Sequence, residues 1–320
     1  MWEASPIYLL IIGIEIFLSN YHQKKVYTWK ETATNFYLSL LNGGIDLLIR
    51  GVYLFLLLYC YQFHLFSIQN PIFYWGTLLI LLDFQFYWLH RLEHYCRLFW
   101  AIHVTHHSSE MMNFTVGFRA SVFQPLYRFI FFIPLTFIGF KPIDILFLYS
   151  LTQFWAIFVH TEFVKKLGWL EYVFVTPSHH RVHHASNILY LDKNMGMVLI
   201  IWDRLFGTFQ PEISAKEYEP IKYGLTTPLE KENALTIIFH EWMNIWKDLR
   251  RKDLNWKLKL QYLFRPPGWS HDGSRKTSEQ LRKQRCIPSP LSPHAYVRRQ
   301  QVKQSAKFYF VAEVNLSNTK

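Results

Sequence analysis

Charge and cysteine are both scarce in this chain of 320 residues. Charged residues make up 18% of the chain, below the average of about 25% for soluble proteins. Hydrophobic residues reach 51% and aromatic residues 18%, which favours a membrane protein with aromatic side chains at the membrane interfaces. The three cysteines, Cys60, Cys96 and Cys286, form no motif, so a disulfide framework is excluded and a reducing compartment is indicated.

Nucleic-acid-binding signatures are absent as well. The formal net charge is +11, and the basic residues become frequent after about residue 212. No zinc finger, helix-turn-helix or RNA-binding motif accompanies this charge, so we expect no nucleic-acid partner. The basic surplus predicts contact with an anionic lipid surface instead. No basic segment precedes the first apolar stretch, which argues against a cleavable signal peptide.

Five apolar stretches predict membrane-spanning helices, because each approaches the roughly 20 residues that cross about 30 Å of hydrocarbon. In the second stretch, Asp46 and Arg50 lie four residues apart and are able to pair on one helix face. The predicted fold class is all-α: a multi-pass membrane bundle of about four to five spans, with a cytoplasmic, histidine-rich cap that holds two metals. The predicted spans are Pro6–Leu18, Ala33–Tyr61, Ile72–Leu89, Val122–Phe140 and Ile143–Phe163.

The connecting loops predict the orientation of these spans. Basic residues lie between the first and second spans (Lys24, Lys25 and Lys30) and between the third and fourth, whereas the segment Gln62–Pro71 has none. By the positive-inside rule the active site and the C-terminus are then cytoplasmic. We expect an inner-membrane protein if the source is bacterial and a protein of the endoplasmic reticulum if it is eukaryotic.

Composition divides the chain into four parts. We predict N-terminal membrane spans over residues 1–70, a catalytic domain over 71–210, a cytoplasmic interfacial extension over 211–270 and a basic, flexible tail over 271–320. Tryptophans and basic residues alternate through Asn233–Phe264. This pattern is typical of a helix in the plane of the membrane interface, and equally of an amphipathic helix packed on the cytoplasmic domain.

Histidine is the unusual residue, with 15 in the chain, mostly in tight groups. Positions i, i+3 and i+4 share one helix face, and two adjacent histidines can be divided between two metals. One such pair arises by chance, and His90 to His94 also fits the H-x-x-E-H motif of some zinc proteases. A protease site with one zinc ion needs only three protein ligands, whereas at least eight histidines are grouped here. His160 stands alone and is either a ligand or a side chain reaching the interface. The candidate metal ligands are His90, His94, His103, His106, His107, His160, His179, His180, His183 and His184.

The donor type narrows the choice of metal. Imidazole suits zinc, copper, iron and nickel, and eight or more neutral nitrogens indicate two metals. Zinc performs no redox chemistry, whereas two iron ions would activate O2. Nearby carboxylates usually orient the imidazoles that bind a metal. Each candidate carboxylate of this chain has an equally good alternative interpretation as an ordinary charge at the membrane interface. Positions 93 and 95 flank His94 on opposite sides of a helix. We therefore expect the Glu93 carboxylate to approach from the side opposite to position 95 and to matter less than Asp83 or Glu162. The candidate carboxylates are Asp83, Glu162 and Asp203 as catalytic residues, with Glu93 and Glu110 as further candidates.

These groups resemble the fatty acid hydroxylase and sterol desaturase superfamily, whose members are membrane di-iron enzymes. Within it, the resemblance is closest to the alkylglycerol monooxygenase family, which cleaves ether lipids with tetrahydrobiopterin. One departure is Tyr95, which stands where we expect that family to have Glu. The resemblance rests on the segments Asp83–Arg91, His103–Glu110, His160–Glu162, Leu170–Phe174, Thr176–His184, Asp192–Asn194, Ile201–Phe209 and Tyr223–Thr226.

The resemblance implies an O2-dependent iron monooxygenase or hydroxylase that oxidises a C–H bond of a membrane lipid. Its electrons would come from an external donor, either a protein or a pterin such as tetrahydrobiopterin. Desaturation within the same superfamily remains an alternative. A histidine-rich membrane protein for metal binding or transport is an alternative of another class, although transporters place their sites at the bilayer midplane within inverted repeats. The ligands implied by the resemblance are His90, His94, His103, His106, His107, His180, His183 and His184, with His160 and His179 as further candidates.

Overall fold

The computed structural model describes residues 5–230 and 233–285, and this part of the chain is helical. It contains no extended strand, only isolated bridges between Phe174 and Leu199 and between Ala185 and Tyr223. The predicted all-α class is therefore confirmed. The α-helices are α1 Ser5–Tyr21, α2 Trp29–Tyr61, α3 Pro71–Tyr95, α4 Arg97–His107, α5 Pro125–Arg128, α6 Ile133–Ile138, α7 Pro142–Phe158, α8 Pro177–His183, α9 Ile201–Leu205, α10 Ala234–Leu249, α11 Trp256–Phe264 and α12 Ser278–Arg285. The 3-10 helices are η2 Val116–Phe118, η3 Phe129–Phe132 and η4 Gly168–Tyr172.

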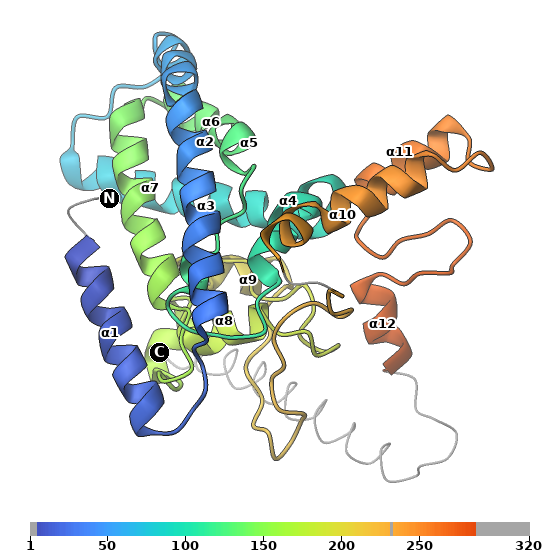
Figure 1. Ribbon diagram of the computed structural model, residues 1–320. Helices are drawn as coiled ribbons and strands as arrows, with labels where there is room; N and C mark the ends of the chain where they lie inside the picture. Colours follow the sequence, from blue (N-terminus) through green and yellow to red (C-terminus); the bar gives the residue numbers. More distant parts are fainter. Residues whose placement is uncertain (1–4, 231–232, 286–320) are drawn as a thin grey trace, which may run out of the picture.

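Two of the described helices, α2 and α3, are long and apolar enough to cross a membrane. Three further apolar segments, Pro6–Tyr21, Pro125–Ile138 and Pro142–Phe158, are shorter. In Figure 1, the axes of α1, α2 and α7 lie roughly parallel to one another, with the chain ascending in α2 and descending in α1 and α7. The first, second and third predicted spans correspond to α1, α2 and α3.

The other two predicted spans differ from the prediction. The stretch Val122–Phe140 is not one helix but a succession of α5, η3 and α6, with Pro125 and Pro134 in the first turns of α5 and α6. Proline lacks the amide hydrogen and clashes with the carbonyl four residues earlier, so a continuous α-helix is interrupted there. The stretch Ile143–Phe163 is helical only to Phe158.

The apolar core lies between α2, α3, α6 and α7. Its buried members include Leu57, Leu78, Leu135 and Ile145. In a water-soluble protein, burial of each such side chain stabilises the fold by about 1.5–3 kcal/mol through the hydrophobic effect. Between helices that face lipid, the hydrophobic effect is absent and close van der Waals packing stabilises the contact instead. The sequence also predicts a pair between Asp46 and Arg50, and the two side chains form it, with Nη2 and Oδ2 2.5 Å apart. The outward faces of α1 and α2 remain apolar and exposed.

The helices bring chemically different residues to their two ends. At one end the loop after α2 contacts the end of α6, where the Leu65 amide donates to the Phe137 carbonyl at 2.7 Å. At the other end Asn35 of α2 donates to the Thr115 hydroxyl at 3.1 Å. The C-termini of α3 and α7 also lie at this second end, together with α4 and α8. The histidine-bearing segments therefore meet at one end of the apolar helices.

The C-terminal extension packs on α4 through buried ion pairs. The Arg97 guanidinium donates through Nε to Glu241 and through Nη1 to Asp248, both at 2.6 Å. In Figure 1, α10 and α11 project from the molecule beside α4. The predicted helix over Asn233–Phe264 is thus two helices, because residues 250–255 are not helical. Within the predicted tail, Ser278–Arg285 forms α12; residues 286–320 of that tail lie outside the described residues.

Candidate di-metal centre

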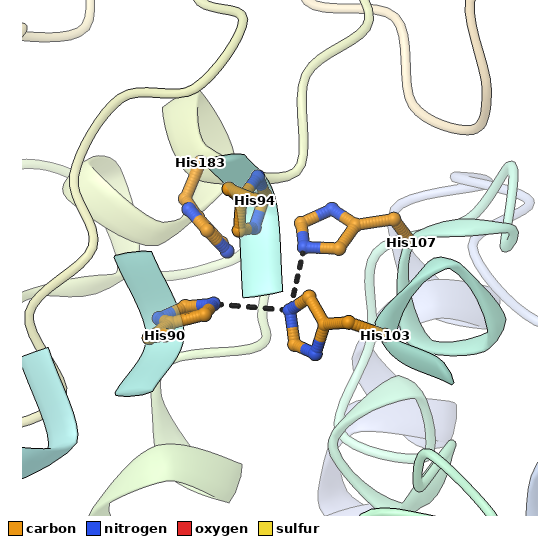
Figure 2. Close-up of side chains that lie close together, drawn as sticks. All are labelled: His90, His94, His103, His107 and His183. Atoms are coloured by element: carbon orange, nitrogen blue, oxygen red, sulfur yellow. Dashed lines mark hydrogen bonds between the residues drawn. The ribbon is translucent and has the colours of Figure 1, made fainter. Parts of the chain in front are cut away.

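Nine histidine side chains form two adjacent groups at the common end of the apolar helices. In each group one ring nitrogen per histidine lies within 4.8 Å of all the others. Figure 2 shows the first group, in which rings from α3, α4 and α8 point toward one another. The first group contains His90, His94, His103, His107 and His183, and the second contains His106, His160, His180 and His184.

The spacing of the motifs explains how the histidines are divided. On α4, His103 and His107 lie one turn apart and enter the first group, whereas His106 enters the second. The segment at α8 has the same spacing with the two groups exchanged: His180 and His184 belong to the second group and His183 to the first. Successive helical residues are about 100° apart, so adjacent histidines face different sites. The predicted division of adjacent histidines between two sites agrees with this geometry.

The Nε2 atoms converge without ordinary hydrogen-bond partners. Distances between Nε2 atoms are 3.0 Å for His90 and His103 and 2.8 Å for His160 and His180. The Nε2 atoms of His94 and His183 are buried and have no partner at all. A buried, unpaired polar atom costs free energy. Inward-facing imidazole nitrogens at these separations are the donor set that a metal ion requires, so the residues fit two metal ions.

The Nδ1 atoms are held mainly by backbone carbonyls. His90 Nδ1–H donates to the Met195 carbonyl at 2.8 Å and His183 Nδ1–H to the Lys193 carbonyl at 2.9 Å. His106 donates to the Arg119 carbonyl at 3.0 Å. A proton on Nδ1 leaves the lone pair on Nε2, so these carbonyls select the tautomer that binds a metal.

The segment 192–199, called here the orienting loop, supplies three of these contacts to the first group. Besides the carbonyls of Lys193 and Met195, its Asp192 carboxylate lies 3.2 Å from His94 Nδ1. Asp192 and Asn194 adopt positive φ angles of 52° and 55°, a conformation that Asp and Asn tolerate better than most residues. Sequence reasoning missed Asp192 as a functional residue, and the Asp192-Lys193-Asn194 motif was the only signal that pointed to it.

Two of the predicted catalytic carboxylates hold the orienting loop rather than a histidine. Asp203 accepts the amides of Met195 and Gly196 at 2.7 and 2.8 Å. Asp83 accepts the amides of Val198 and Leu199 at 2.9 and 3.0 Å. A Cβ at Gly196 would lie 2.6 Å from the Leu199 carbonyl oxygen, so the loop also requires glycine there. Asp83 and Asp203 therefore act on the histidines through the loop.

Glu162, the third predicted catalytic carboxylate, accepts a hydrogen bond from the Tyr223 hydroxyl. No hydrogen bond or ion pair joins Glu162 to any of the nine histidines within the described part of the chain. It lies two residues after His160, in a segment that follows the end of α7. Its contact with Tyr223 ties that segment to the C-terminal extension.

Glu93 is placed differently from the prediction. We expected Asp83 or Glu162 to matter more, but Glu93 is the carboxylate beside a clustered histidine: its Oε2 lies 3.3 Å from His103 Nδ1 and the side chain is fully buried. Its Oε1 accepts hydrogen bonds from Gln124 at 2.8 Å and from Tyr127. The prediction considered only the positions around His94 on α3, whereas the Glu93 carboxylate meets His103 on α4.

His179 is the one predicted ligand that the structure leaves outside both groups. It occupies the first turn of α8, and its Nδ1 lies 3.4 Å from the Thr176 amide, where it completes a capping box. Its Nε2 faces Glu171 at 4.0 Å. Because it directly precedes His180 on the helix, it points to another side.

Burial keeps the imidazoles outside the apolar helices neutral. It lowers the pKa of His106 to about 4. It also lowers the pKa of His103, His107 and His183 well below the usual value, with neighbouring histidines adding to the effect. Only the neutral ring offers a lone pair to a metal, so the site is prepared to bind cations at neutral pH.

A cavity of about 130 Å³ adjoins both histidine groups on the side of the apolar helices. It is bordered by His90 and His103 of the first group and by three histidines of the second. Asn42 of α2 and Gln153 of α7 line its other side. We call it the first cavity. A substrate placed there would lie beside both histidine groups.

The sequence that carries the two histidine groups is similar to known proteins. Residues 75–208 match the model of the fatty acid hydroxylase family. This segment, which makes up less than half of the chain, is therefore similar to a fatty acid hydroxylase domain. The matched segment includes all nine clustered histidines. Seven of them lie on α3, α4 and α8, His184 directly follows α8, and His160 follows α7. No solved structure matches the chain.

Several curated proteins are similar to the chain beyond this domain match. Alkylglycerol monooxygenase of Homo sapiens is 39% identical over 199 residues, covering 61% of this chain and 42% of that protein. Alkylglycerol monooxygenase of Xenopus tropicalis is 33% identical over 281 residues, covering 83% and 59%. Ornithine lipid hydroxylase of Rhizobium tropici is 31% identical over 152 residues, covering 47% and 46%. The chain thus spans about two fifths to three fifths of the length of these relatives.

Proposed function

We propose that the chain is a membrane-bound, O2-dependent lipid monooxygenase that uses two iron ions. One observation carries the proposal: nine imidazoles, eight of them buried and that of His106 partly buried, converge in two adjacent groups beside a cavity among apolar helices. The ligands of one ion would be His90, His94, His103, His107 and His183. The ligands of the other would be His106, His160, His180 and His184. The relatives named alkylglycerol monooxygenase support a lipid substrate with an ether-linked alkyl chain.

Iron suits both the donor set and the reaction. Imidazole nitrogen binds iron, copper, nickel and zinc, but insertion of an oxygen atom into a C–H bond requires a metal that changes oxidation state. Two bound iron ions would supply electrons to O2 and oxidise the C–H bond. The overall balance is lipid-H plus O2, two electrons and two protons, giving lipid-OH and water. An external donor must supply the electrons, and we propose tetrahydrobiopterin as that donor.

The contribution of the chain itself is position and exclusion of water. The carbonyls of Lys193, Met195 and Arg119 fix the Nδ1–H tautomer of three rings, so Nε2 stays free for the metal. Glu93 adds a negative charge behind His103. Burial of the rings removes bulk water from the reaction site, which protects a reactive oxidant from side reactions.

The first cavity is the proposed site of the lipid carbon that is oxidised. Phe86 and Met197 provide apolar lining, while Asn42 and Gln153 provide polar groups at the other side. Because Asn42, Phe86 and Gln153 belong to α2, α3 and α7, a lipid would enter between helices that face hydrocarbon. A polar group near the oxidised carbon of the lipid would find hydrogen-bond partners there.

The decisive experiment supplies the purified protein with an alkylglycerol, 18O2 and tetrahydrobiopterin. We expect one 18O atom per oxidised product, and we expect His183→Ala to abolish it. His64→Ala is the matched control, because His64 is exposed, belongs to neither histidine group, and lies against the ring and the carbonyl of Tyr61. An unlabelled product, or a fully active His183→Ala variant, would contradict the proposal.

Desaturation is the closest alternative, since loss of a second hydrogen would replace hydroxyl transfer at the same site. In that case the product would carry a double bond and no 18O. A role in metal transport would instead give metal uptake without lipid product. Both alternatives are therefore separated from the proposal by the same labelling experiment.

We also propose that the protein crosses the membrane several times with its histidine cluster on the cytoplasmic side. The basic loops and the position of the cluster at one end of the apolar helices support this orientation. Reporter fusions at Gln69 and at Lys320 should report opposite sides of the membrane. If both report the same side, the number of spans is wrong.

A further inference from the structure

The helices α10 and α11 form a helical hairpin in which both helices are attached to α4. The ion pairs of Arg97 with Glu241 and Asp248 hold α10. The Arg97 amide also donates to the carbonyl of Arg265, directly after α11, at 3.1 Å. In Figure 1 the α10–α11 hairpin points sideways, across the axes of α2 and α7. The hairpin therefore lies across these apolar helices and not along them.

The first turns of α10 pack against α2 near the histidine end of that helix. Ile237 and Ile238 of α10 belong to one buried cluster with Leu38 of α2. Leu38 lies about one turn after Asn35, which contacts the loop beside the histidine groups. The outward face of α2 continues from there as an exposed apolar surface, as at Leu40. The hairpin thus begins beside the point where α2 leaves the histidine end.

Each helix of the hairpin leaves one apolar face exposed. The residues of each face are four or seven positions apart, so they share one side of their helix. All six side chains are between 41% and 68% exposed. They are Leu235, Phe239 and Trp246 on α10, and Trp256, Leu260 and Phe264 on α11.

The polar side of α10 faces elsewhere. Thr236, His240 and Asn244 border a cavity of about 750 Å³ between the hairpin, α4 and the first histidine group. Asn244 lies nine residues after Leu235, and at about 100° per residue the two positions are on opposite sides of the helix. The exposed apolar face of α10 is therefore separate from both its packed side and its cavity side.

Basic residues accompany the exposed apolar faces. Residues 234–264 contain six basic and three acidic residues, and each of the three acids has an ion-pair partner. The Arg250 guanidinium lies 5.5 Å from the ring centroid of Trp246, and the Lys257 ammonium lies 5.8 Å from that of Trp256. Aromatic and aliphatic residues on one face, with lysine and arginine beside them, are typical of helices that lie in the interface of an anionic membrane.

We propose that the α10–α11 hairpin lies on the surface of the bilayer, with its exposed apolar faces among the lipid chains and its basic residues bound to anionic headgroups. The inference rests on the proposed crossing of the membrane by the apolar helices. A second copy of the chain would place the same basic residues against each other, whereas anionic lipid is complementary to them. The two sequence interpretations of residues 233–264 then apply to different sides of the hairpin, because one side packs on α4 and another contacts lipid.

The test measures how closely each side of the hairpin approaches lipid in the full chain. Leu235→Cys and Leu260→Cys place a fluorescent label on the two exposed faces, in protein whose three natural cysteines are replaced by alanine. The protein is reconstituted in nanodiscs of neutral phosphatidylcholine and anionic phosphatidylglycerol. Some lipids carry a nitroxide, which quenches nearby labels, either near the headgroup or near the end of the acyl chain. Two reporter positions on different helices guard against misfolding of one variant.

Two control positions separate the possible outcomes. Asn244→Cys is the matched control, because it is exposed on the opposite side of α10 from Leu235. Leu48→Cys labels the exposed face of α2 and reports the membrane crossing itself. If the label at Leu48 is not quenched by any nitroxide lipid, the proposed crossing fails.

We expect nitroxide near the headgroup to quench the labels at positions 235 and 260 but not the label at 244. In the same lipid mixture, nitroxide on phosphatidylglycerol should quench at least about twofold more than nitroxide on phosphatidylcholine, because lysine and arginine gather anionic lipid. Combining Arg250→Gln with Lys257→Gln should remove this difference. Labels at 235 and 260 that stay unquenched while Leu48 is quenched would overturn the inference, since a second copy or the chain after residue 285 would then cover the faces. Equal quenching by the two lipids would overturn the binding of anionic headgroups.

Discussion

Replacing Glu93 with glutamine should weaken the metal centre more than replacing any other carboxylate near it. The Glu93 side chain is fully buried, and its Oε2 faces His103 Nδ1 at 3.3 Å. Gln124 and Tyr127 both donate to Oε1, so the amide oxygen of a glutamine would take that place. Its NH2 group would then face His103 Nδ1. A donor there favours the tautomer with the proton on Nε2, which cannot bind a metal.

The expected loss of metal affinity in Glu93→Gln follows from the contact between Glu93 and His103. Loss of a partner that orients a metal-binding histidine costs about 10–100-fold in metal affinity or activity, or about 1.4–2.8 kcal/mol. Iron content and initial rate of Glu93→Gln should be compared with those of Glu162→Gln, whose carboxylate contacts Tyr223 and no clustered histidine. We expect the loss in Glu93→Gln only. Normal iron content in Glu93→Gln, together with loss in Glu162→Gln, would refute the reasoning.

Three further predictions concern the orienting loop, the extension and pH. Asp192→Asn should lower iron affinity about tenfold, because His94 loses its charged partner; titration with a chelator measures this, and an unchanged affinity would contradict it. Arg97→Ala should destabilise the protein by about 3 kcal/mol, because it leaves Glu241 without its ion-pair partner and Asp248 with Arg275 alone, whereas Arg251→Ala, which removes an exposed pair, should leave the denaturation midpoint unchanged. Burial lowers the pKa of His106 to about 4 from about 6.5 when unfolded, so between these values the unfolded chain binds more protons. The thermal midpoint of metal-free protein should therefore fall as pH falls from about 6.5 to 4, and a rise would contradict this.

The sequence was sufficient to predict the helical class and the division of the histidines. Hydrophobic stretches and the i, i+3, i+4 spacing are local, so α2, α3 and the opposite facing of His106 and His107 could be predicted from neighbouring residues alone. His160 could not be decided, because its place in the second group depends on a contact with α8, 20 residues later along the chain.

The orientation of the histidine rings could not be predicted in the same way. The carbonyls of Met195 and Lys193 carry no side-chain signature, so no pattern marks them as partners of His90 and His183. Glu93 was misplaced because its partner lies on another helix. The cavity of about 750 Å³ beside His94, His107 and His183 could not be predicted either, because its walls join α4 to segments that lie more than 100 residues later in the chain.

The most direct test of the di-metal centre is the iron content of the purified protein, measured by mass spectrometry against protein concentration. The two histidine groups predict close to two iron ions per chain. They also predict about one ion in His180→Ala, which removes a ligand only from the second group, and two ions in the control His64→Ala. A content of one ion or none in the unaltered protein, or two ions in His180→Ala, would contradict a centre built from these two groups.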